Sequence, residues 1–426
     1  MIVVFVLVGL VVPAAFGALH WYAWRRLVRD TTRGPGLARR TGTVVIVTGP
    51  VLMFAALIAE RTGAPFWLQR VLGWPGFLWM AFSLYLLLAL VAAEFVRPLV
   101  RRLVEREAPA EVAVPRPERV PAGTAATEPE PGSAPEPESK EPESAGPSRA
   151  AAPSRRLFVS RVVGGAAAAA AVGTVGYGTY GVLRGPGVKR VTVPLAKLPR
   201  SAHGFRIAVV SDIHLSPVLG RGFAQRVVDT INSTQPDLIA VVGDLVDGSV
   251  KDLGPAAAPL SRLKARHGSY FVTGNHEYFS GAAQWVEEVR RLGLNPLENA
   301  RTELPAFDLA GVNDVAGESE GQGPDFGKAL GDRDTTRAVV LLAHQPVQIH
   351  EAVRHDVDLQ LSGHTHGGQL WPGNLVAAAA NPTVAGLERY GATQLYVSRG
   401  AGAWGPPTRV GAPSDITVVE LASRQA

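Results

Sequence analysis

The sequence predicts an α/β domain joined to an α-helical membrane region. Apolar residues are concentrated in the first hundred positions and again near position 170, in uncharged runs long enough to cross a bilayer. From His203 onward, short β-branched runs alternate with amphipathic stretches, a pattern typical of α/β domains. Because 426 residues exceed one typical domain, we expect these two kinds of structure to form separate units.

Three uncharged runs, residues 1–19, 41–59 and 72–93, occupy the first hundred positions. Each can span ~30 Å of hydrocarbon at ~1.5 Å per residue, which favours transmembrane helices over buried core helices. The first run lacks a basic segment before it, so we expect a retained span instead of a cleaved signal peptide. These observations predict a three-span transmembrane region over residues 1–106.

Arginine is unevenly distributed around these runs, and this predicts their orientation. Residues 1–102 contain 11 Arg and no Lys against three acidic residues. Most of the arginines lie in the loop after the first run or beyond the third, which places both segments in the cytoplasm. The rest of the chain is slightly acidic, so the pI near 9.6 gives no support for binding nucleic acid. The cytoplasmic arginines are Arg25, Arg26, Arg29, Arg33, Arg39, Arg40, Arg97, Arg101, Arg102 and Arg106.

Residues 107–154 are rich in Pro, Glu, Ala and Ser, and we expect a disordered cytoplasmic linker. An anchor helix is predicted next, over residues 155–185. Its start, Ser154-Arg155-Arg156-Leu157-Phe158-Val159, resembles a twin-arginine translocation signal, although ordinary positive-inside arginines before a fourth span are an equal alternative. Under either interpretation, the chain after Gly185 lies outside the cytoplasmic membrane, in a multi-pass protein.

Five predicted strands of the C-terminal half end in polar clusters. The expected strands are residues 206–211, 238–242, 270–273, 339–343 and 359–361, with a helix over 223–231. Open α/β sheets place their sites beyond the carboxyl ends of strands, where these side chains would gather. The clusters are Asp212-Ile213-His214, Gly243-Asp244-Leu245-Val246-Asp247, Gly274-Asn275-His276-Glu277, Ala343-His344 and Gly363-His364-Thr365-His366.

The residue types in these clusters predict a metal site. The chain has no cysteine, so a metal must be held by His, Asp, Glu or Asn. Two divalent ions ~3.5–4 Å apart can activate water and clamp phosphate oxygens. Imidazole, carboxylate and amide ligands suit manganese, iron or zinc. We expect two divalent ions, with manganese first and iron or zinc as alternatives. Any one of these residues alone is better explained as a cap or core residue, but five ordered clusters favour a site.

In this order the clusters closely resemble the calcineurin-like metallophosphoesterase superfamily, whose pattern is D-x-H, G-D-x-x-D, G-N-H-D/E, a lone H and G-H-x-H. The resemblance covers residues 195–421 and implies a four-layer α/β/β/α sandwich of two mixed sheets flanked by helices. Gly363-His364-Thr365-His366-Gly367-Gly368-Gln369, Gly311-Val312-Asn313-Asp314 and Pro407-Thr408-Arg409 resemble its bacterial membrane-associated phosphodiesterase branch.

The resemblance also implies a role for each matching residue. His276 would contact the phosphate and assist the leaving oxygen, with Asp247 orienting its ring. Glu277 is left without a role, and Arg409 is either a phosphate contact or a surface residue. The metal ligands implied are Asp212, His214 and His366 for one ion, Asn275, His344 and His364 for the other, and Asp244 as the bridge.

We therefore expect a metal-dependent phosphoesterase, most simply a phosphodiesterase, with a dinuclear metal centre and an extracytoplasmic or lipid-linked phosphate-ester substrate. A nuclease of the same fold is an alternative that the lack of basic surplus disfavours. A non-enzymatic binding module attached to the bilayer is another. The segment 315–333, rich in Gly, Glu and Asp, is expected to be a lid or a disordered loop.

Overall fold

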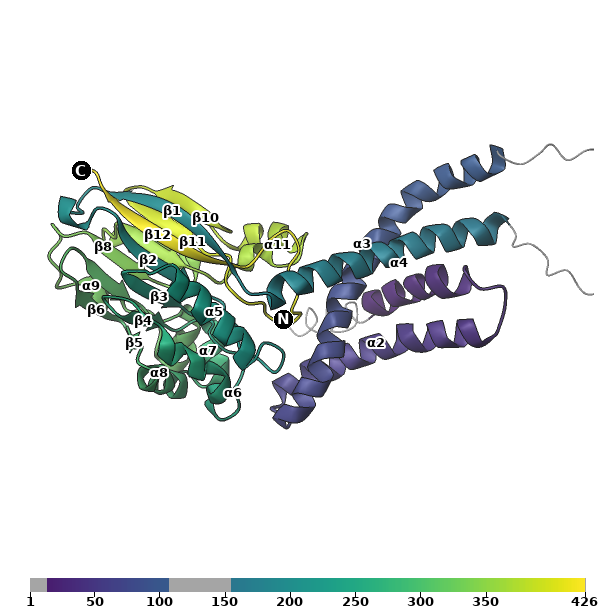
Figure 1. Ribbon diagram of the computed structural model, residues 1–426, viewed down its shortest axis with the longest axis horizontal. Helices are drawn as coiled ribbons and strands as arrows, with labels where there is room; N and C mark the ends of the chain where they lie inside the picture. Colours follow the sequence, from purple (N-terminus) through teal and green to yellow (C-terminus); the bar gives the residue numbers. More distant parts are fainter. Residues whose placement is uncertain (1–13, 107–154, 426) are drawn as a thin grey trace, which may run out of the picture.

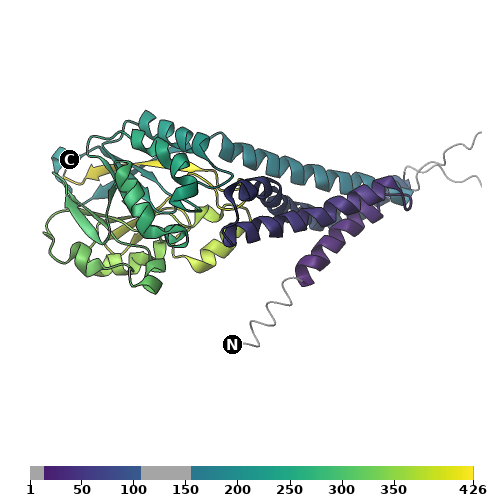
Figure 2. The ribbon, with the colours of Figure 1, turned by 90° about the horizontal axis from the view of Figure 1, so that it is seen from below.

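The protein is elongated, with an α/β domain at one end and a group of long helices at the other (Figure 1). The computed structural model describes residues 14–106 and 155–425. The predicted linker and most of the first apolar run lie outside these residues. A second view shows the helices leaving the same end of the α/β domain (Figure 2).

Three of the described helices, α2, α3 and α4, are long and apolar enough to cross a membrane. They comprise α2 (Leu37–Arg61), α3 (Phe66–Arg106) and α4 (Arg155–Leu183). Residues 14–24 are also helical and continue into the π-helix η1 (Arg25–Arg29). The arginine-rich turn between η1 and α2, the end of α3 and the start of α4 all lie remote from the α/β domain (Figure 1).

A glycine contact and a partly buried ion pair join the long helices. A Cβ at Gly49 of α2 would lie 2.0 Å from the Trp79 ring of α3. Such close approach at glycine is typical of helix pairs in membranes, where van der Waals packing drives association. Arg26 donates to Glu94 of α3 at 2.9 Å, and the Tyr22 hydroxyl donates to the same carboxylate at 2.8 Å.

The α/β domain contains two six-stranded mixed sheets. The first has the order β1-β12-β2-β3-β4-β5, in which only β12 and β2 pair antiparallel. The second has the order β10-β11-β9-β8-β7-β6, with antiparallel pairs at its two edges. The first contains β1 (Gly187–Leu195), β12 (Asp415–Ser423), β2 (Phe205–Val210), β3 (Leu238–Val242), β4 (Ser269–Val272) and β5 (Asn295–Pro296); the second contains β10 (Gly386–Tyr390), β11 (Thr393–Val397), β9 (Leu359–Ser362), β8 (Val339–Leu342), β7 (Asp308–Gly311) and β6 (Ala300–Glu303).

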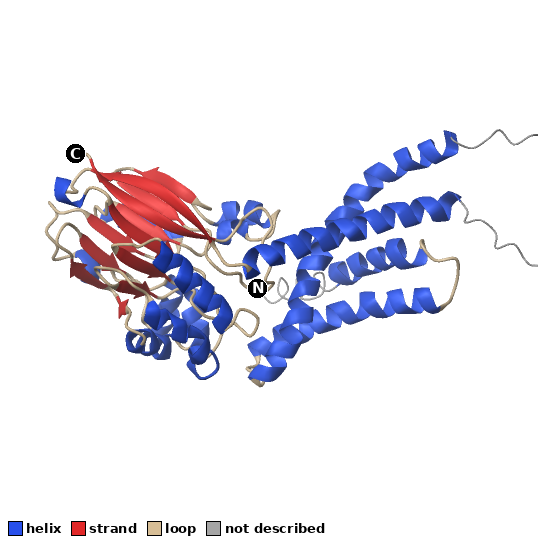
Figure 3. Ribbon diagram, viewed as in Figure 1, coloured by secondary structure: helices blue, strands red, loops and turns tan. Residues whose placement is uncertain are grey.

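Helices cover the outer face of each sheet, which gives the four layers that the sequence predicted (Figure 3). The amphipathic helix α5 buries Phe223 and Val227 against the first sheet, and α8 buries Trp285 there. On the second sheet, α9 contributes Phe326 and α10 contributes Ile349. The helices are α5 (Arg221–Ser233), α6 (Val250–Ala257), α7 (Asn275–Ser280), α8 (Ala282–Arg291), α9 (Phe326–Leu330), α10 (Ile349–Arg354) and α11 (Gly373–Ala380), with short 3-10 turns η2 (Arg200–Ala202), η3 (Ala258–Arg262), η4 (Val315–Glu320), η5 (Pro346–Gln348) and η6 (His366–Gly368).

Segment 315–333 is ordered by its own hydrogen bonds and forms η4 and α9. The Asp314 carboxylate accepts from the Ala316 N–H at 2.8 Å and so caps η4. The Asn313 side chain donates to the Gln322 carbonyl at 2.9 Å. The expectation of disorder there was wrong, because it rested on composition and overlooked these capping side chains.

The anchor helix leads almost directly into the first sheet. α4 ends at Leu183 and β1 begins at Gly187, before the predicted start of the domain at residue 195. β1 then pairs in parallel with the whole of β12. The α/β domain is therefore held close to the end of α4.

Candidate metal centre

The five polar clusters lie together where the carboxyl ends of both sheets meet. β2, β3 and β4 of the first sheet lead into the clusters at Asp212, Asp244 and Asn275. β8 and β9 of the second sheet lead into those at His344 and His364. Parallel strands end at one edge of a sheet, so residues far apart in the sequence converge.

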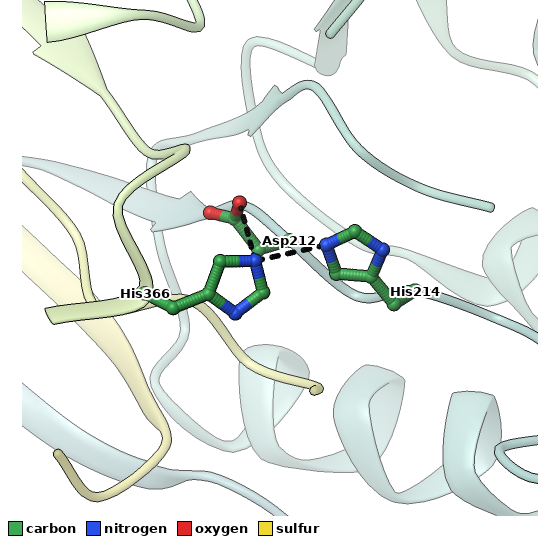
Figure 4. Close-up of side chains that lie close together, drawn as sticks. All are labelled: Asp212, His214 and His366. Atoms are coloured by element: carbon green, nitrogen blue, oxygen red, sulfur yellow. Dashed lines mark hydrogen bonds and ion pairs between the residues drawn. The ribbon is translucent and has the colours of Figure 1, made fainter. Parts of the chain in front are cut away.

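Asp212, His214 and His366 form the first candidate ligand group (Figure 4). Nε2 of His366 lies 3.3 Å from Oδ1 of Asp212 and 3.0 Å from Nε2 of His214. Nδ1 of His214 donates to the Asp247 carboxylate at 2.8 Å, so Nε2 keeps its lone pair. Two imidazole nitrogens and one carboxylate oxygen, all buried, thus lie close enough together to coordinate one divalent ion.

Asp244, His344 and His364 form the second candidate group. Nδ1 of His344 donates to the Val242 carbonyl at 2.9 Å, which leaves the lone pair of Nε2 directed into the site. That Nε2 is buried without a hydrogen-bond partner, and such an atom needs another ligand. The Asn275 amide oxygen lies 3.0 Å from Nδ1 of His364 and extends this group.

Asp244 lies between the two groups. Its Oδ2 is 3.1 Å from Nε2 of His344 and 3.7 Å from Nε2 of His214. The structure thereby brings together all seven side chains that the resemblance implies as ligands. Their ligand atom types fit two divalent cations that share one carboxylate, as does Nε2 of His344, which faces the Asp244 carboxylate.

The electrostatics of the site favour bound cations. Burial lowers the pKa of His344, but the charges of Asp244, Asp212 and Asp314 outweigh burial and raise it well above the usual value. The same carboxylates would attract a metal ion. Burial lowers the pKa of His364 to about 4, which keeps its ring neutral and able to act as a ligand.

The backbone of the ligand loops is tightly constrained. Five of the candidate ligands adopt positive φ, which is uncommon for residues other than glycine. A Cβ at Gly274 would lie 2.3 Å from Oδ1 of Asp244, and one at Gly363 would lie 2.4 Å from Oδ2 of Asp212. Glycine is required there because the backbone passes against a ligand oxygen. The five ligands are Asp212 (φ 51°), His214 (φ 47°), Asp244 (φ 51°), His364 (φ 72°) and His366 (φ 53°).

His276 and Asp247 form a hydrogen-bonded pair beside the ligand groups. Nδ1 of His276 is 2.7 Å from Oδ1 of Asp247, the same oxygen that accepts from His214. Burial alone lowers the pKa of His276, but Asp247, helped by Asp244, raises it to about 9. The His276 side chain is 16% exposed, so a protonated imidazole reaches the mouth of the site.

Glu277, which the sequence analysis left without a role, joins the loops of the site. Its buried carboxylate accepts from the backbone N–H groups of Asp244 at 3.0 Å, Leu245 at 2.8 Å and Gly274 at 2.6 Å. It therefore fixes the loop of the bridging Asp244 against the loop of Asn275. Its place within the Gly-Asn-His-Glu cluster was the only signal available.

Arg409 supports His366 and does not point to a substrate site. Its guanidinium is buried and donates to the carbonyls of Gly402 and His366, at 2.6 and 3.0 Å. Its Nη2 lies 3.2 Å from Nδ1 of His366. The interpretation of Arg409 as a phosphate contact is not supported by these contacts.

The end of the α2–α3 hairpin also reaches the site. Glu60 and Gln69 line a small cavity together with Ser216, Asp247 and Gly405. No local pattern marks Glu60, which at the end of an apolar helix resembles any polar residue at a membrane boundary. Glu60 was therefore not predicted as a residue of the site.

Comparison with known proteins assigns the family. Residues 205–368 match the sequence profile of the family described as Calcineurin-like phosphoesterase. The chain is 31% identical over 284 residues to the uncharacterized metallophosphoesterase YkuE of Bacillus subtilis, covering 63% of this chain and 98% of that protein. The chain belongs to the calcineurin-like phosphoesterase family. An uncharacterized metallophosphoesterase of Aquifex aeolicus is 34% identical over 239 residues, covering 55% of this chain and 91% of that protein.

Some other matching proteins share only part of their length with this chain. The chain is 39% identical over 259 residues to a "Transmembrane protein with metallophosphoesterase domain" of Danio rerio. That match covers 58% of this chain and 59% of the Danio rerio protein. The resemblance inferred from the five clusters is thus confirmed at the level of family.

Proposed function

We propose that this protein is a metal-dependent phosphoesterase that cleaves phosphodiesters at the outer face of the cytoplasmic membrane. One observation supports it above all: two ligand groups share Asp244, beside the His276–Asp247 pair. A binding module has no need of a proton donor held next to a metal centre. The intact pair therefore favours an enzyme.

In this proposal, Asp212, His214 and His366 hold one ion, and Asn275, His344 and His364 hold the other. Asp244 bridges them. When bound, the ions would supply Lewis-acid chemistry, polarising phosphate oxygens and lowering the pKa of water. Manganese is our first choice, and iron and zinc have compatible ligand preferences.

His276 is the proposed proton donor to the leaving oxygen. Its pKa of about 9 keeps Nε2 protonated at neutral pH, and Asp247 holds Nδ1 so that Nε2 faces outward. The positive ring also attracts the phosphate. After His276 has donated its proton, the negative charge of Asp247 favours reprotonation of the imidazole ring.

The surrounding charge favours a diester over a monoester. Glu60 lines the same small cavity as Asp247, so a carboxylate from the α2–α3 hairpin lies beside the candidate metal centre. A monoester carries up to two negative charges and a diester carries one. Repulsion by an ionised Glu60 would therefore disfavour the monoester more strongly.

We assign residues 1–106 to a transmembrane region, 107–154 to a cytoplasmic linker, 155–185 to an anchor and 195–421 to the phosphoesterase domain. The arginine-rich turn before α2 lies at the end of the helices remote from that domain (Figure 1). The positive-inside bias puts that turn in the cytoplasm, which supports an extracytoplasmic domain.

Activity is tested on the purified full chain with bis(p-nitrophenyl) phosphate as diester and p-nitrophenyl phosphate as monoester. We expect manganese-dependent turnover that prefers the diester and stops with chelator. A Glu60→Gln variant should gain monoester activity relative to diester activity. Turnover that persists in chelator, or a metal-loaded protein inert on all phosphate esters, would contradict the proposal.

Orientation is tested with single cysteines, because the chain has none of its own. In intact bacterial cells expressing the full chain, a membrane-impermeant maleimide should label exposed Ser261→Cys and spare Gly34→Cys in the turn before α2. The reverse pattern would place the domain in the cytoplasm. Adding Arg155→Lys and Arg156→Lys to the Ser261→Cys variant tests export: loss of its labelling indicates a twin-arginine signal, and retained labelling indicates ordinary membrane insertion.

A further inference from the structure

Helix α11 presents an apolar surface to solvent within the α/β domain. None of its residues is buried, and Leu375 and Val376 are 65% and 73% exposed. Trp371, just before the helix, is 53% exposed. Contiguous exposed apolar residues on a folded domain mark an interaction site.

The chain around α11 is uncharged over an unusually long stretch. Residues 367–387 contain no Asp, Glu, Lys or Arg. Only eight of these residues form the helix α11, and prolines stand at positions 372 and 382, so the segment is not a transmembrane helix. The exposed residues of this stretch are Trp371, Leu375, Val376, Leu387 and three alanines of α11, so its solvent-facing part is apolar.

α11 is joined to the membrane helices on one side. The Tyr85 hydroxyl of α3 donates to the Trp371 carbonyl at 3.0 Å. Leu370 and Val410 pack against the cluster formed by α3 and α4. In Figure 1, α11 lies on the side of the domain that faces these helices. Its exposed face is thus continuous with the surface of helices that are long and apolar enough to cross a membrane.

On its other side, α11 is joined to the metal centre. It follows the His364–His366 loop, and a Cβ at Gly368 would lie 2.3 Å from Asn374 at the start of α11. Trp404 is 52% exposed, and its ring lies 5.7 Å from the ring of His276. Exposed aromatic residues thus border the site at the end of the domain nearest the membrane helices.

We propose that α11 and Trp371 insert into the outer leaflet at the lipid–water interface and hold the metal centre open toward the bilayer surface. Tryptophan beside short apolar segments is favoured at that depth. The occupant of the α11 surface is membrane lipid. Given the proposed phosphodiesterase activity, the substrate class is then a phosphodiester lipid taken directly from the bilayer.

A second copy of the chain is a less suitable occupant. α11 is short and offers no charged side chain to orient a protein partner. Its continuity with α3 and α4 puts it where lipid is already present. Lipid contact needs no further component.

Insertion is tested without reference to activity. The full chain carrying Val376→Cys is labelled with an NBD fluorophore and reconstituted in vesicles of phosphatidylethanolamine and phosphatidylglycerol. We expect blue-shifted emission and quenching by spin-labelled lipid. Val353→Cys on α10, 36% exposed, is the matched control and should show neither.

Two results would overturn the insertion. One is lipid quenching at Val376 no stronger than at Val353. The other is a blue-shifted label that neither spin-labelled lipid nor aqueous iodide quenches, because a protein partner then covers α11.

Substrate presentation is tested with the double variant Leu375→Ser and Val376→Ser. We expect about a tenfold lower rate on a phosphodiester lipid embedded in vesicles, because two inserted side chains lose their apolar contacts. The rate on soluble bis(p-nitrophenyl) phosphate should not change. The conservative pair Leu375→Ile and Val376→Ile should retain both activities.

An equal loss of hydrolysis rate on both substrates, or no loss on either, would overturn the proposal that α11 gives the metal centre access to membrane lipid. If Val376 inserts while the wild-type protein cleaves no phosphodiester, the proposed enzyme activity fails and the membrane location of α11 stands. Failure of the proposed phosphodiesterase activity can therefore be distinguished from failure of the proposed insertion of α11.

Discussion

The metal centre and the membrane helices constrain their residues in different ways. In the loops of the candidate ligands, glycines lie against carboxylate oxygens, as at Gly363, whose Cβ would lie 2.4 Å from Asp212. On α4, Gly165, Gly173 and Gly176 have open space where a Cβ would be placed. The structure of the loops thus depends on the identity of individual residues. The long helices require apolar composition along most of their length and specific small residues only where they cross. Substitutions in the two regions should differ accordingly.

The largest effect is expected for Asp244→Asn, which removes the shared carboxylate. Loss of ~4 kcal/mol of transition-state stabilisation would lower kcat ~10³-fold. Metal content, measured by mass spectrometry of the purified protein, should also fall. Asp229→Asn, on the exposed face of α5, is the matched control and should leave both unchanged. Normal turnover by Asp244→Asn would remove the dinuclear centre from the mechanism.

His276→Ala and Asp247→Asn should separate proton donation from metal binding. His276→Ala is expected to lower kcat ~10²–10⁴-fold and keep its metals. Asp247→Asn should also weaken metal affinity ~10–100-fold, because Oδ1 of Asp247 contacts both His276 and the ligand His214. Titration of the metal-free variants with manganese measures the difference. Equal metal affinities would show that Asp247 does not support His214.

A smaller effect is expected for Arg409→Lys. A lysine cannot donate to Gly402, His366 and Ala412 in the geometry of the guanidinium. We expect metal affinity to fall ~10–100-fold, with little change in KM for the diester at saturating metal. Arg399→Lys, at a partly exposed position, is the control. A raised KM with unchanged metal affinity would instead identify Arg409 as a phosphate contact.

The smallest effect on activity is expected for Gly49→Ala, although its Cβ would lie 2.0 Å from the Trp79 ring. Overpacking should destabilise the α2–α3 contact by ~1–3 kcal/mol. Thermal unfolding of the detergent-solubilised protein measures this loss, while turnover of the soluble diester should stay unchanged. Gly165→Ala, which meets open space, should be neutral in both assays. If Gly49→Ala abolished soluble turnover, the two regions would not be separable.

Much of the catalytic half was predictable because its chemistry is local in sequence. β3 was predicted at its observed bounds, and the ligands follow their strands as expected. The calcineurin-like fold followed from the order of five short clusters. Such clusters are recognisable because each combines a buried strand with ligand side chains within a few residues.

The features missed were contacts between segments distant in sequence. Glu60 reaches the site from a membrane hairpin, and Arg409 reaches His366 from a late loop. Glu60 has no pattern of its own, since a charged residue after an apolar run fits several environments. The Pro407-Thr408-Arg409 motif draws attention to Arg409 but does not reveal its contact with His366. Only the three-dimensional arrangement relates them to the metal centre. α11 was missed because an apolar stretch with two prolines resembles an ordinary loop.

The short junction between α4 and β1 has a consequence for kinetics. Three residues, Arg184 to Pro186, separate the two elements, and fully extended they span only ~10 Å. The domain consequently stays within a fixed height of the bilayer and meets lipids by diffusion in two dimensions. For the proposed lipid substrate, the rate should follow its surface density, so diluting that lipid with inert lipid should slow turnover even when the bulk concentration is unchanged.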